Sequence, residues 1–389
     1  MSKLLERDRC TGCMACFQVC PKSCLTIKKD NMGNLFPEID DSICVQCNKC
    51  EKVCPEKHLL QKQYPRKAYA VWSFDSQTRK LAASGGAASE FYRYAVNNGW
   101  WICGTEWTDE FQVSHTLSKK ANSISKYRQS KYVYSSSSEI YRQVEKKLKD
   151  GEKVLFISLP CKVAGMLQYL DGRHENLITI DIVCHGTPSH QLLREHIKDK
   201  FNGEIATALS FRQDNEFVFS LKNSQKDIYT KVGRTDSYLA AFLEGLDYRP
   251  SCYQCTYASN ERISDLTICD FWGLGQKIPF KHPYTGAISA VLVNTDKGAE
   301  FFEKCKTAFF VEERPVAEAL EGNAQLNHPT TPHPKREMFE KLYLKKGFDK
   351  AVEEILKDKM HEEKKKLRKQ ELRRKLREIS GIFIKKYRR

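Results

Sequence analysis

Short apolar runs and amphipathic segments alternate along the middle of the chain, from residue 68 onward. Apolar runs bounded by polar residues predict strands, and apolar residues three or four positions apart predict helices. Strands are expected at residues 70–74, 100–107, 154–158, 177–183, 205–211, 216–221, 227–231 and 287–294. Helices are expected at residues 86–97, 139–148, 163–170 and 191–201, with another starting near residue 296. This order predicts an α/β domain whose mixed sheet carries helices on its faces.

The two ends of the chain have different patterns. Residues 1–63 are rich in cysteine and repeat internally, and the Tyr64-Pro65-Arg66-Lys67 stretch reads as a linker. From about residue 335 the pattern is helical. We therefore expect three parts: residues 1–63, residues 68–330 and a helical, basic extension at residues 331–389.

The internal repeat consists of cysteines. Each run has the spacing C-x2-C-x2-C-x3-C-P, and the second run is shifted by 34 residues. This is the spacing of bacterial two-cluster ferredoxins, in which the fourth cysteine of one run binds the cluster of the other. We predict one 4Fe-4S cluster on the first set, which is Cys10, Cys13, Cys16 and Cys54. We predict another on the second set, which is Cys20, Cys44, Cys47 and Cys50.

Zinc is the alternative, because paired CxxC motifs also bind zinc. Zinc sites rarely use three cysteines that are each separated by two residues and followed by a fourth cysteine before proline. Here this arrangement occurs twice. The repeat therefore favours clusters and predicts a ferredoxin-like domain that moves single electrons. Cys24 lies outside the pattern and is expected to be a spare thiol.

This 389-residue chain contains sixteen cysteines, and the role expected for them depends on the cellular compartment of the protein. Residues 1–9 have mixed charge and no apolar core, and no segment reaches the roughly 18–20 apolar residues of a membrane span. We therefore expect the protein to be cytoplasmic. In the cytoplasm thiols stay reduced, so cysteines bind metals more often than they form disulfides.

The net charge of +15 is concentrated at the C-terminal end. Residues 357–389 contain fifteen Lys and Arg against five Asp and Glu. A helix is expected at residues 364–386, with apolar residues on one side at Leu367, Leu372, Leu376, Ile379 and Phe383. Such a helix fits peripheral contact with the inner membrane face, an acidic partner or a solvated helix. No base-reading module accompanies it, so no nucleic acid partner is expected.

Six short motifs follow one another in the middle region. They are Ala83-Ser84-Gly85-Gly86-Ala87, Ser130-Lys131-Tyr132-Val133, Leu159-Pro160-Cys161-Lys162, Val183-Cys184-His185-Gly186, Cys252-Tyr253-Gln254-Cys255 and Asp270-Phe271-Trp272-Gly273. In this order they resemble the family of coenzyme F420 hydrogenase/dehydrogenase beta subunits. Two positions depart from the family pattern. Lys162 stands where Gln is frequent, and Cys269 stands where Gly commonly precedes the last motif.

The resemblance implies FAD and a further 4Fe-4S cluster. The matching ligands form the third set, which is Cys161, Cys184, Cys252 and Cys255. Spacing alone leaves other interpretations open: a zinc knuckle, or two buried thiols beside an unrelated CxxC motif. The remaining Cys103, Cys269 and Cys305 are expected to behave as small apolar residues.

The flavin site is expected at two stretches. Ser84, Gly85 and Gly86 precede a helix, where backbone N–H groups can approach a phosphate, although such a turn can also be structural. Ser130, Lys131, Tyr132 and Ser135 form the second stretch, where Lys131 is either a phosphate partner or a surface lysine. Neither G-x-G-x-x-G nor a P-loop signature occurs, so no nicotinamide domain is expected.

His185 is the candidate catalytic residue, because histidine can supply a proton during reduction. A hydrogen-bonding or packing role is the alternative. We expect an iron-sulfur flavoprotein oxidoreductase that takes electrons from ferredoxin, coenzyme F420 or another redox partner and passes them through FAD to a small-molecule substrate. The resemblance points to a substrate in polysaccharide biosynthesis. A non-catalytic electron-transfer subunit and a redox sensor are the other functions considered.

Overall fold

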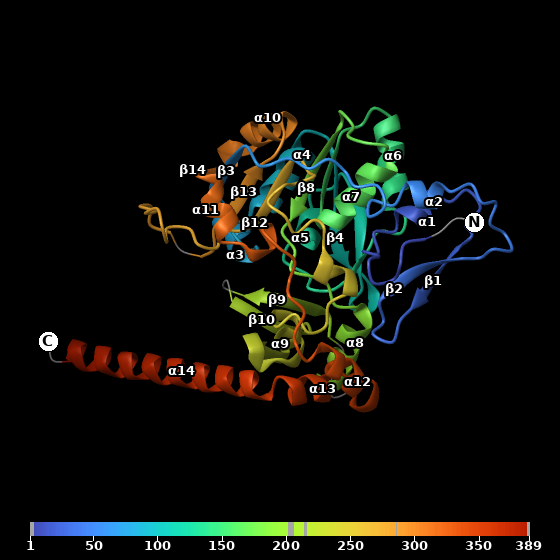
Figure 1. The fold of residues 1–389 in the computed structure, drawn as a ribbon. Coiled ribbons are helices and arrows are strands. Elements are labelled where there is room, and N and C mark those ends of the chain that lie inside the picture. The colour runs from blue at the N-terminus through green and yellow to red at the C-terminus, as the bar shows by residue number, and fades with distance from the viewer. Residues whose placement is uncertain (1–3, 201–205, 214–215, 285, 387–389) are drawn as a thin grey trace.

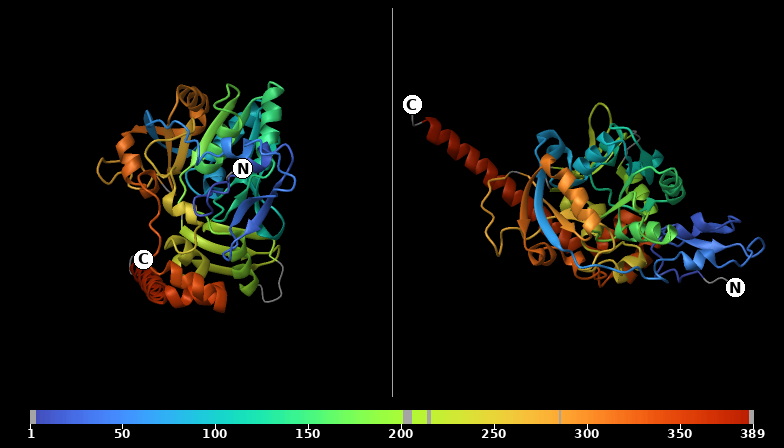
Figure 2. Two further views of the ribbon diagram at one scale, coloured as in Figure 1. Left: turned by 45° about the vertical axis from the view of Figure 1, so that its right-hand side comes forward. Right: turned by 90° about the horizontal axis from the view of Figure 1, so that it is seen from above.

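The computed structural model describes residues 4–200, 206–213, 216–284 and 286–386. A small cysteine-rich module lies at the N-terminal end, and a long helix projects from the opposite end of the molecule (Figures 1 and 2). The module has two short helices and one antiparallel hairpin. Its elements are α1 (Ala15–Val19), β1 (Leu25–Lys29), β2 (Leu35–Ile39) and α2 (Lys49–Lys52).

A nine-stranded mixed sheet forms the centre of the molecule. In spatial order its strands are β14 (Phe309–Arg314), β3 (Lys67–Ser73), β13 (Ser289–Val293), β12 (Leu266–Asp270), β8 (Leu177–Ile182), β7 (Val154–Ser158), β4 (Trp101–Trp107), β5 (Val113–Ser118) and β6 (Ser135–Ser136). Strands β12, β8, β7 and β4 run parallel. Every residue of β7 is buried, as expected for a parallel strand covered on both faces.

Helices cover both faces of this sheet. One face packs against α4 (Ala87–Asn97), α5 (Ser123–Tyr127) and α10 (Asp296–Cys305). The other packs against α6 (Ile140–Lys149), α7 (Pro160–Tyr169) and α11 (Val316–Glu321). A short helix, α3 (Ser76–Leu81), follows β3. The N-terminal module packs on the face covered by α6 and α7, and its Cys13, Ala15 and Val53 join their core.

A second, smaller lobe lies below the central sheet in Figure 1. It has a three-stranded antiparallel sheet in the order β11 (Asp227–Val232), β10 (Glu216–Lys222) and β9 (Ala208–Gln213). Helices α8 (His190–Lys200), α9 (Ser237–Leu243), α12 (Arg336–Lys346) and α13 (Phe348–Ile355) share one core with this sheet. The first part of the predicted C-terminal extension is therefore packed into a lobe.

A buried charge network ties this lobe together. His196 of α8 contacts Asp349 of α13 at 2.5 Å through Nδ1 and Asp236 at 3.0 Å through Nε2. Lys200 pairs with the same Asp349 at 2.7 Å. Burial opposes the charged imidazole, but the two carboxylates outweigh it and raise the pKa of His196 to about 9.

The last helix, α14 (Lys357–Lys386), leaves the lobe and extends away from it (Figure 1). Leu372 and Leu376 are 60% and 57% exposed. The side chains of Ile379 and Phe383 lie outside the described part. Among the described residues, no helix combines the length and the apolar character that crossing a bilayer requires.

The predicted fold class is confirmed: a ferredoxin-like module, a mixed sheet with helices on its faces, and C-terminal helices. The predicted strands and helices of the middle region correspond to observed elements, apart from the ends at residues 201 and 205, which lie outside the described residues. Strands β5, β6, β12 and β14 and the helices α3, α5, α9 and α11 were not predicted. The sixteen cysteines all lie in the described residues, and none of them forms a disulfide there.

Candidate functional site

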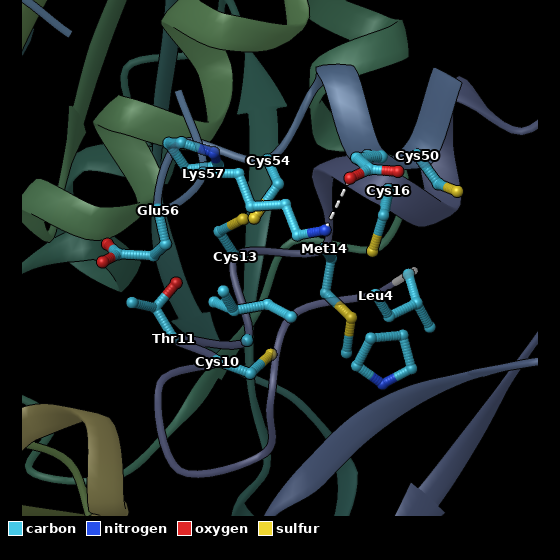
Figure 3. Close-up of a pocket in the computed structure, with 15 residues that line it drawn as sticks. Leu4, Cys10, Thr11, Cys13, Met14, Cys16, Cys50, Cys54, Glu56 and Lys57 are labelled. Atoms are coloured by element: carbon cyan, nitrogen blue, oxygen red, sulfur yellow. Dashed lines mark hydrogen bonds and ion pairs between the residues drawn. The ribbon is translucent and has the colours of Figure 1, made fainter. Parts of the chain in front are cut away.

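The first set of cysteines faces one cavity in the N-terminal module. Cys10, Cys13, Cys16 and Cys54 line it together with Cys50 and Met14. Figure 3 shows the sulfur atoms of the first set turned toward this space, whereas the sulfur of Cys50 points away from it. The thiol of Cys16 is close enough to those of Cys10, Cys13 and Cys54 for their charges to interact. These four thiols fit the crossed ligation predicted from the repeat.

The second set gathers on the side of the module toward which Cys50 points. Cys20 packs in one small cluster with Cys44 and Cys50, and Cys47 is exposed. Cys24 joins this cluster, with its sulfur 3.4 Å from that of Cys20. Burial works against ionisation of Cys20, but hydrogen bonds from Cys24 outweigh it and lower the pKa of Cys20. Cys24, predicted to be a spare thiol, is thus in contact with a predicted ligand.

The two cysteine runs share an unusual backbone conformation. Gly12 and Met14 have φ angles of 67° and 69°, and the residues 34 positions later, Gln46 and Asn48, have 51° and 57°. The left-handed region is unfavourable for residues other than glycine. Alternating backbone conformations of this kind turn successive N–H groups inward, which makes a nest for an anionic group such as an iron-sulfur cluster. The repeated geometry is an independent indication that both loops fit clusters.

The third set comes from three separated segments. Cys161 is the second residue of helix α7, and Cys184 follows strand β8. Cys252 lies in a 3-10 turn, η3 (Pro250–Gln254), and Cys255 directly follows it. The thiol of Cys184 is close enough to those of the other three for their charges to interact. Burial raises the pKa of all four, to about 11 for Cys255. Buried thiolates need a compensating cation, which a bound cluster core would provide.

Across the described residues, no three His, Cys, Asp or Glu side chains come close enough to hold a single metal ion. The four thiolates of a cubane bind four different irons and therefore stand further apart than the ligands of one ion.

The first and third sets are neighbours across the interface between module and sheet. The thiol of Cys161 is close enough to that of Cys13 for their charges to interact. Gly165, one turn further along α7, packs directly on Cys13. Tyr134 and Tyr141 contact the same region, and burial raises the pKa of both phenols.

Five side chains of the larger body hold the loop of residues 10–13 through its carbonyl oxygens. Each donates one hydrogen bond: Tyr134 and Lys162 to Gly12 at 2.8 and 2.6 Å, Ser137 and Tyr141 to Cys13 at 2.7 and 2.9 Å, and Arg249 to Cys10 at 2.5 Å. The module is thus fixed by buried polar contacts, none of which any local sequence pattern would reveal.

The predicted glycine turn lies between two strands and a helix. Gly86 is the N-cap of α4, with a φ of 92°. A Cβ on Gly85 would be 2.4 Å from the carbonyl oxygen of Val71, and the Gly85 N–H donates to Ser289 Oγ at 2.9 Å. Ser84 donates to the carbonyl of Ile288 at 3.2 Å. Gly85 therefore has a packing role here.

The second predicted stretch is partly buried and adjoins the first. Lys131 donates to the carbonyl of Arg128 at 3.1 Å, and burial lowers the pKa of Lys131 to about 8. Arg128 in turn contacts Thr78 at 3.5 Å, beside the glycine turn. Tyr132 accepts a hydrogen bond from Arg212 at 3.5 Å. Ser130 is partly buried and Ser135 is buried.

Several polar atoms around these stretches are buried and lack a hydrogen-bond partner. They are Arg79 Nε, Arg128 Nε, Arg212 Nε and Nη2, and Ser135 Oγ. Buried guanidinium groups are costly when unpaired, and such groups often await a ligand. Unpaired donors from three arginines fit an anionic cofactor such as one with a diphosphate. None of the three arginines was among the residues predicted from the sequence.

His185 lies next to Cys184 and faces a charged pair. Arg212 contacts Asp270 at 3.4 Å, and both groups influence the imidazole. Desolvation lowers the pKa of His185, although Asp270 partly opposes this. The imidazole is therefore mostly neutral at neutral pH.

Comparisons with known proteins found matches for the N-terminal module and for part of the larger domain. Residues 9–58 match the family described as 4Fe-4S dicluster domain, and residues 151–319 match the C-terminal part of the coenzyme F420 hydrogenase/dehydrogenase beta subunit. The chain is 20% identical over 337 residues to a subunit of the F(420)H(2) dehydrogenase of Methanosarcina mazei, covering 81% of this chain and 87% of that one.

Two further relatives match. An uncharacterized ferredoxin of Methanocaldococcus jannaschii is 36% identical over 59 residues, which span 15% of this chain and 75% of the ferredoxin. A chain of the F420-reducing [NiFe] hydrogenase complex from Methanosarcina barkeri aligns with a TM-score of 0.47 at 18% identity, covering 76% of this chain and 92% of that one. The chain therefore carries an N-terminal 4Fe-4S dicluster domain at residues 9–58, and its residues 151–319 match the C-terminal part of coenzyme F420 hydrogenase/dehydrogenase beta subunits.

Proposed function

We propose that this chain is an iron-sulfur flavoprotein that relays single electrons through three 4Fe-4S clusters toward a flavin and an organic substrate. The observation that carries the proposal is the adjacency of the first and third sets, through Cys13 and Cys161. The thiols of Cys16 and Cys50 are also close enough for their charges to interact, which links the first set to the second. Electrons would enter near the exposed Cys47, from ferredoxin or another redox partner.

The proposed functional units are residues 1–63, 68–330 and 331–389. The unpaired arginine atoms support an anionic cofactor in the second unit, and FAD is the cofactor that the family resemblance suggests. A bound flavin would accept electrons singly and deliver them in pairs. The residues proposed to hold it are Ser84, Gly85, Gly86, Ser130, Lys131, Tyr132 and Ser135, joined by Arg79 and Arg128.

His185 is proposed to hold or supply a proton at an imidazole nitrogen. Its place between Cys184 and the Arg212–Asp270 pair supports this role, because protons and electrons would then meet at one end of the relay.

The experiment uses anaerobically purified chain, reconstituted with iron, sulfide and FAD and mixed with reduced ferredoxin in a stopped-flow instrument. We expect flavin bleaching in the wild type and at least a tenfold slower bleaching in Cys161→Ser, while the clusters of the first two sets still reduce. Cys305→Ala is the matched control, since Cys305 lies in an apolar core. Equal bleaching rates in Cys161→Ser and the wild type would refute the relay.

A second candidate is a non-catalytic electron-transfer subunit of a larger oxidoreductase. It is favoured by the 87% coverage of a protein that is itself described as a subunit. The substrate screen decides between the two, and starts with coenzyme F420 and with activated or lipid-linked sugars. Turnover by the isolated chain supports the enzyme. A chain that bleaches, turns over none of them and co-purifies with another oxidoreductase supports the subunit.

A further inference from the structure

A buried lysine lies between the first and third sets. Lys162 follows Cys161 in helix α7, and it is 1% exposed. Its Nζ donates to the carbonyl oxygen of Gly12 at 2.6 Å, in the middle of the loop that carries Cys10 and Cys13. One side chain thus connects the backbone of one proposed cluster loop to the start of the helix that carries a ligand of the other.

The surroundings of this ammonium group contain no carboxylate partner. Among the described residues, no Asp or Glu forms an ion pair with Lys162. The thiols of Cys161, Cys13 and Cys10 are close enough for a negative charge on them to act on the ammonium group. The ring of Tyr134 lies 4.4 Å away and contributes a cation–π contact.

A second cation contacts the same loop. Arg249 is 2% exposed and donates to the carbonyl oxygens of Cys10 and Leu35. Its guanidinium also stacks over Phe36 at 4.4 Å. Two buried cations near each other, without a carboxylate, are expensive unless an anion lies nearby. Thiolate-bound clusters on either side would supply that negative charge.

We propose that Lys162 is a positioning residue for electron transfer, serving as a shared counter-charge to the clusters on the first and third sets and fixing their separation. This inference rests on the proposed function, because it requires both clusters. A positive charge stabilises the more negative, reduced state of a cluster, and cluster potentials depend on nearby charges and hydrogen bonds. Lys162 therefore raises the reduction potentials of these two clusters together.

The test is an anaerobic redox titration of the full chain, followed by electron paramagnetic resonance. The three signals are assigned beforehand with Cys47→Ser, Cys16→Ser and Cys252→Ser. In Lys162→Met we expect the reduction potentials of the first-set and third-set clusters to fall. A tenfold change in the reduction equilibrium of one cluster corresponds to a shift of 59 mV in its potential. The potential of the second-set cluster stays unchanged and serves as the internal control.

Lys162→Gln separates charge from position, because it keeps a donor for Gly12 and loses the charge. It should lower the same two potentials while electron transfer between the clusters stays faster than in Lys162→Met. Lys149→Gln, at a lysine 71% exposed, is the matched control for charge loss and should shift nothing. Unchanged potentials in a fully loaded Lys162→Gln, equal shifts of all three, or loss of iron in both Lys162 variants would overturn the proposal. A wild type that never holds the first-set and third-set clusters would instead refute the proposed function.

Discussion

Gly165 of helix α7 lies against Cys13 of the N-terminal module, so closely that a Cβ on Gly165 would be 3.2 Å from the Cys13 sulfur and 2.8 Å from the Tyr141 hydroxyl oxygen. The module and the sheet therefore meet without space for a side chain at this point. Cys161 lies in the first turn of the same helix, so in the proposed relay this interface would be part of the electron path.

The first prediction concerns this contact. Gly165→Val should push the module away from α7, with an overpacking cost of about 1–3 kcal/mol in the free energy of unfolding. We expect slower electron transfer between the first-set and third-set clusters and faster proteolysis between the module and β3. On anaerobic protein, rapid-freeze electron paramagnetic resonance measures the electron transfer and limited proteolysis measures the digestion.

Gly151→Ala is the control for this variant. Gly151 has a φ of 74° and open space around its α carbon, so alanine there adds backbone strain without touching a cluster loop. If Gly151→Ala slowed electron transfer between the clusters as much as Gly165→Val, the contact at Gly165 would not be the cause of the slower transfer.

The second prediction concerns the cofactor. Lys131→Met should weaken FAD binding to the apoprotein about tenfold or more, because a charge-assisted hydrogen bond contributes roughly 1.5–3 kcal/mol. Fluorescence titration with FAD measures this affinity. Lys126→Gln, at a lysine 62% exposed, should bind FAD like the wild type. An unchanged affinity in Lys131→Met would remove this lysine from the proposed site.

The third prediction follows from the pKa of His196. Because the folded pKa of about 9 lies above the ordinary value near 6.5, the network stabilises the fold fully below about pH 6.5. That contribution is lost as pH rises through 9, and it amounts to the order of 3 kcal/mol.

Urea unfolding midpoints of the anaerobic wild type should accordingly fall between pH 6.5 and 9.5. His196→Gln should start with lower stability and show a flatter profile over this range. His361→Gln, at an exposed position of α14, is the control and should keep the wild-type slope. Parallel profiles for His196→Gln and the wild type would show that the imidazole is not charged in the folded state.

The fourth prediction concerns the projecting helix. Deleting residues 367–389 removes a stretch whose described side chains, as at Leu372 and Leu376, are mostly exposed. We expect an unchanged melting temperature, and we propose that the wild type co-sediments with vesicles of anionic lipid through this helix whereas the deletion variant does not. Retained vesicle binding would point to a different membrane-facing surface, and a large fall in melting temperature would show that the helix packs on the body.

The sequence predicted those features that depend on residues near one another in the chain. Cys10, Cys13 and Cys16 sit on one short loop, so their spacing alone points to a cluster. The buried strand β7 was predicted because all five of its residues are consecutive and apolar or small. Strand β14 was missed because its apolar start, Phe309-Phe310-Val311, runs directly into charged residues.

Other features arise only from the tertiary fold. The third set is assembled from segments up to 94 positions apart, from Cys161 to Cys255, and only a family resemblance brought these cysteines together. Arg128 and Arg212 have no distinctive neighbours in the sequence, yet they present unpaired donors near the same two stretches. Cys24 lies outside the repeated spacing, and the short turn that brings it onto Cys20, four positions earlier, has no sequence pattern that predicts this contact.

The central claim is that three clusters form one relay, and the iron and acid-labile sulfide content of the anaerobically purified chain tests it most directly. Each 4Fe-4S cluster contributes four irons, so the account predicts about twelve irons and twelve sulfides per chain, falling to about eight of each in Cys184→Ser. About eight irons in the wild type, unchanged in Cys184→Ser, would contradict the third cluster and with it the relay.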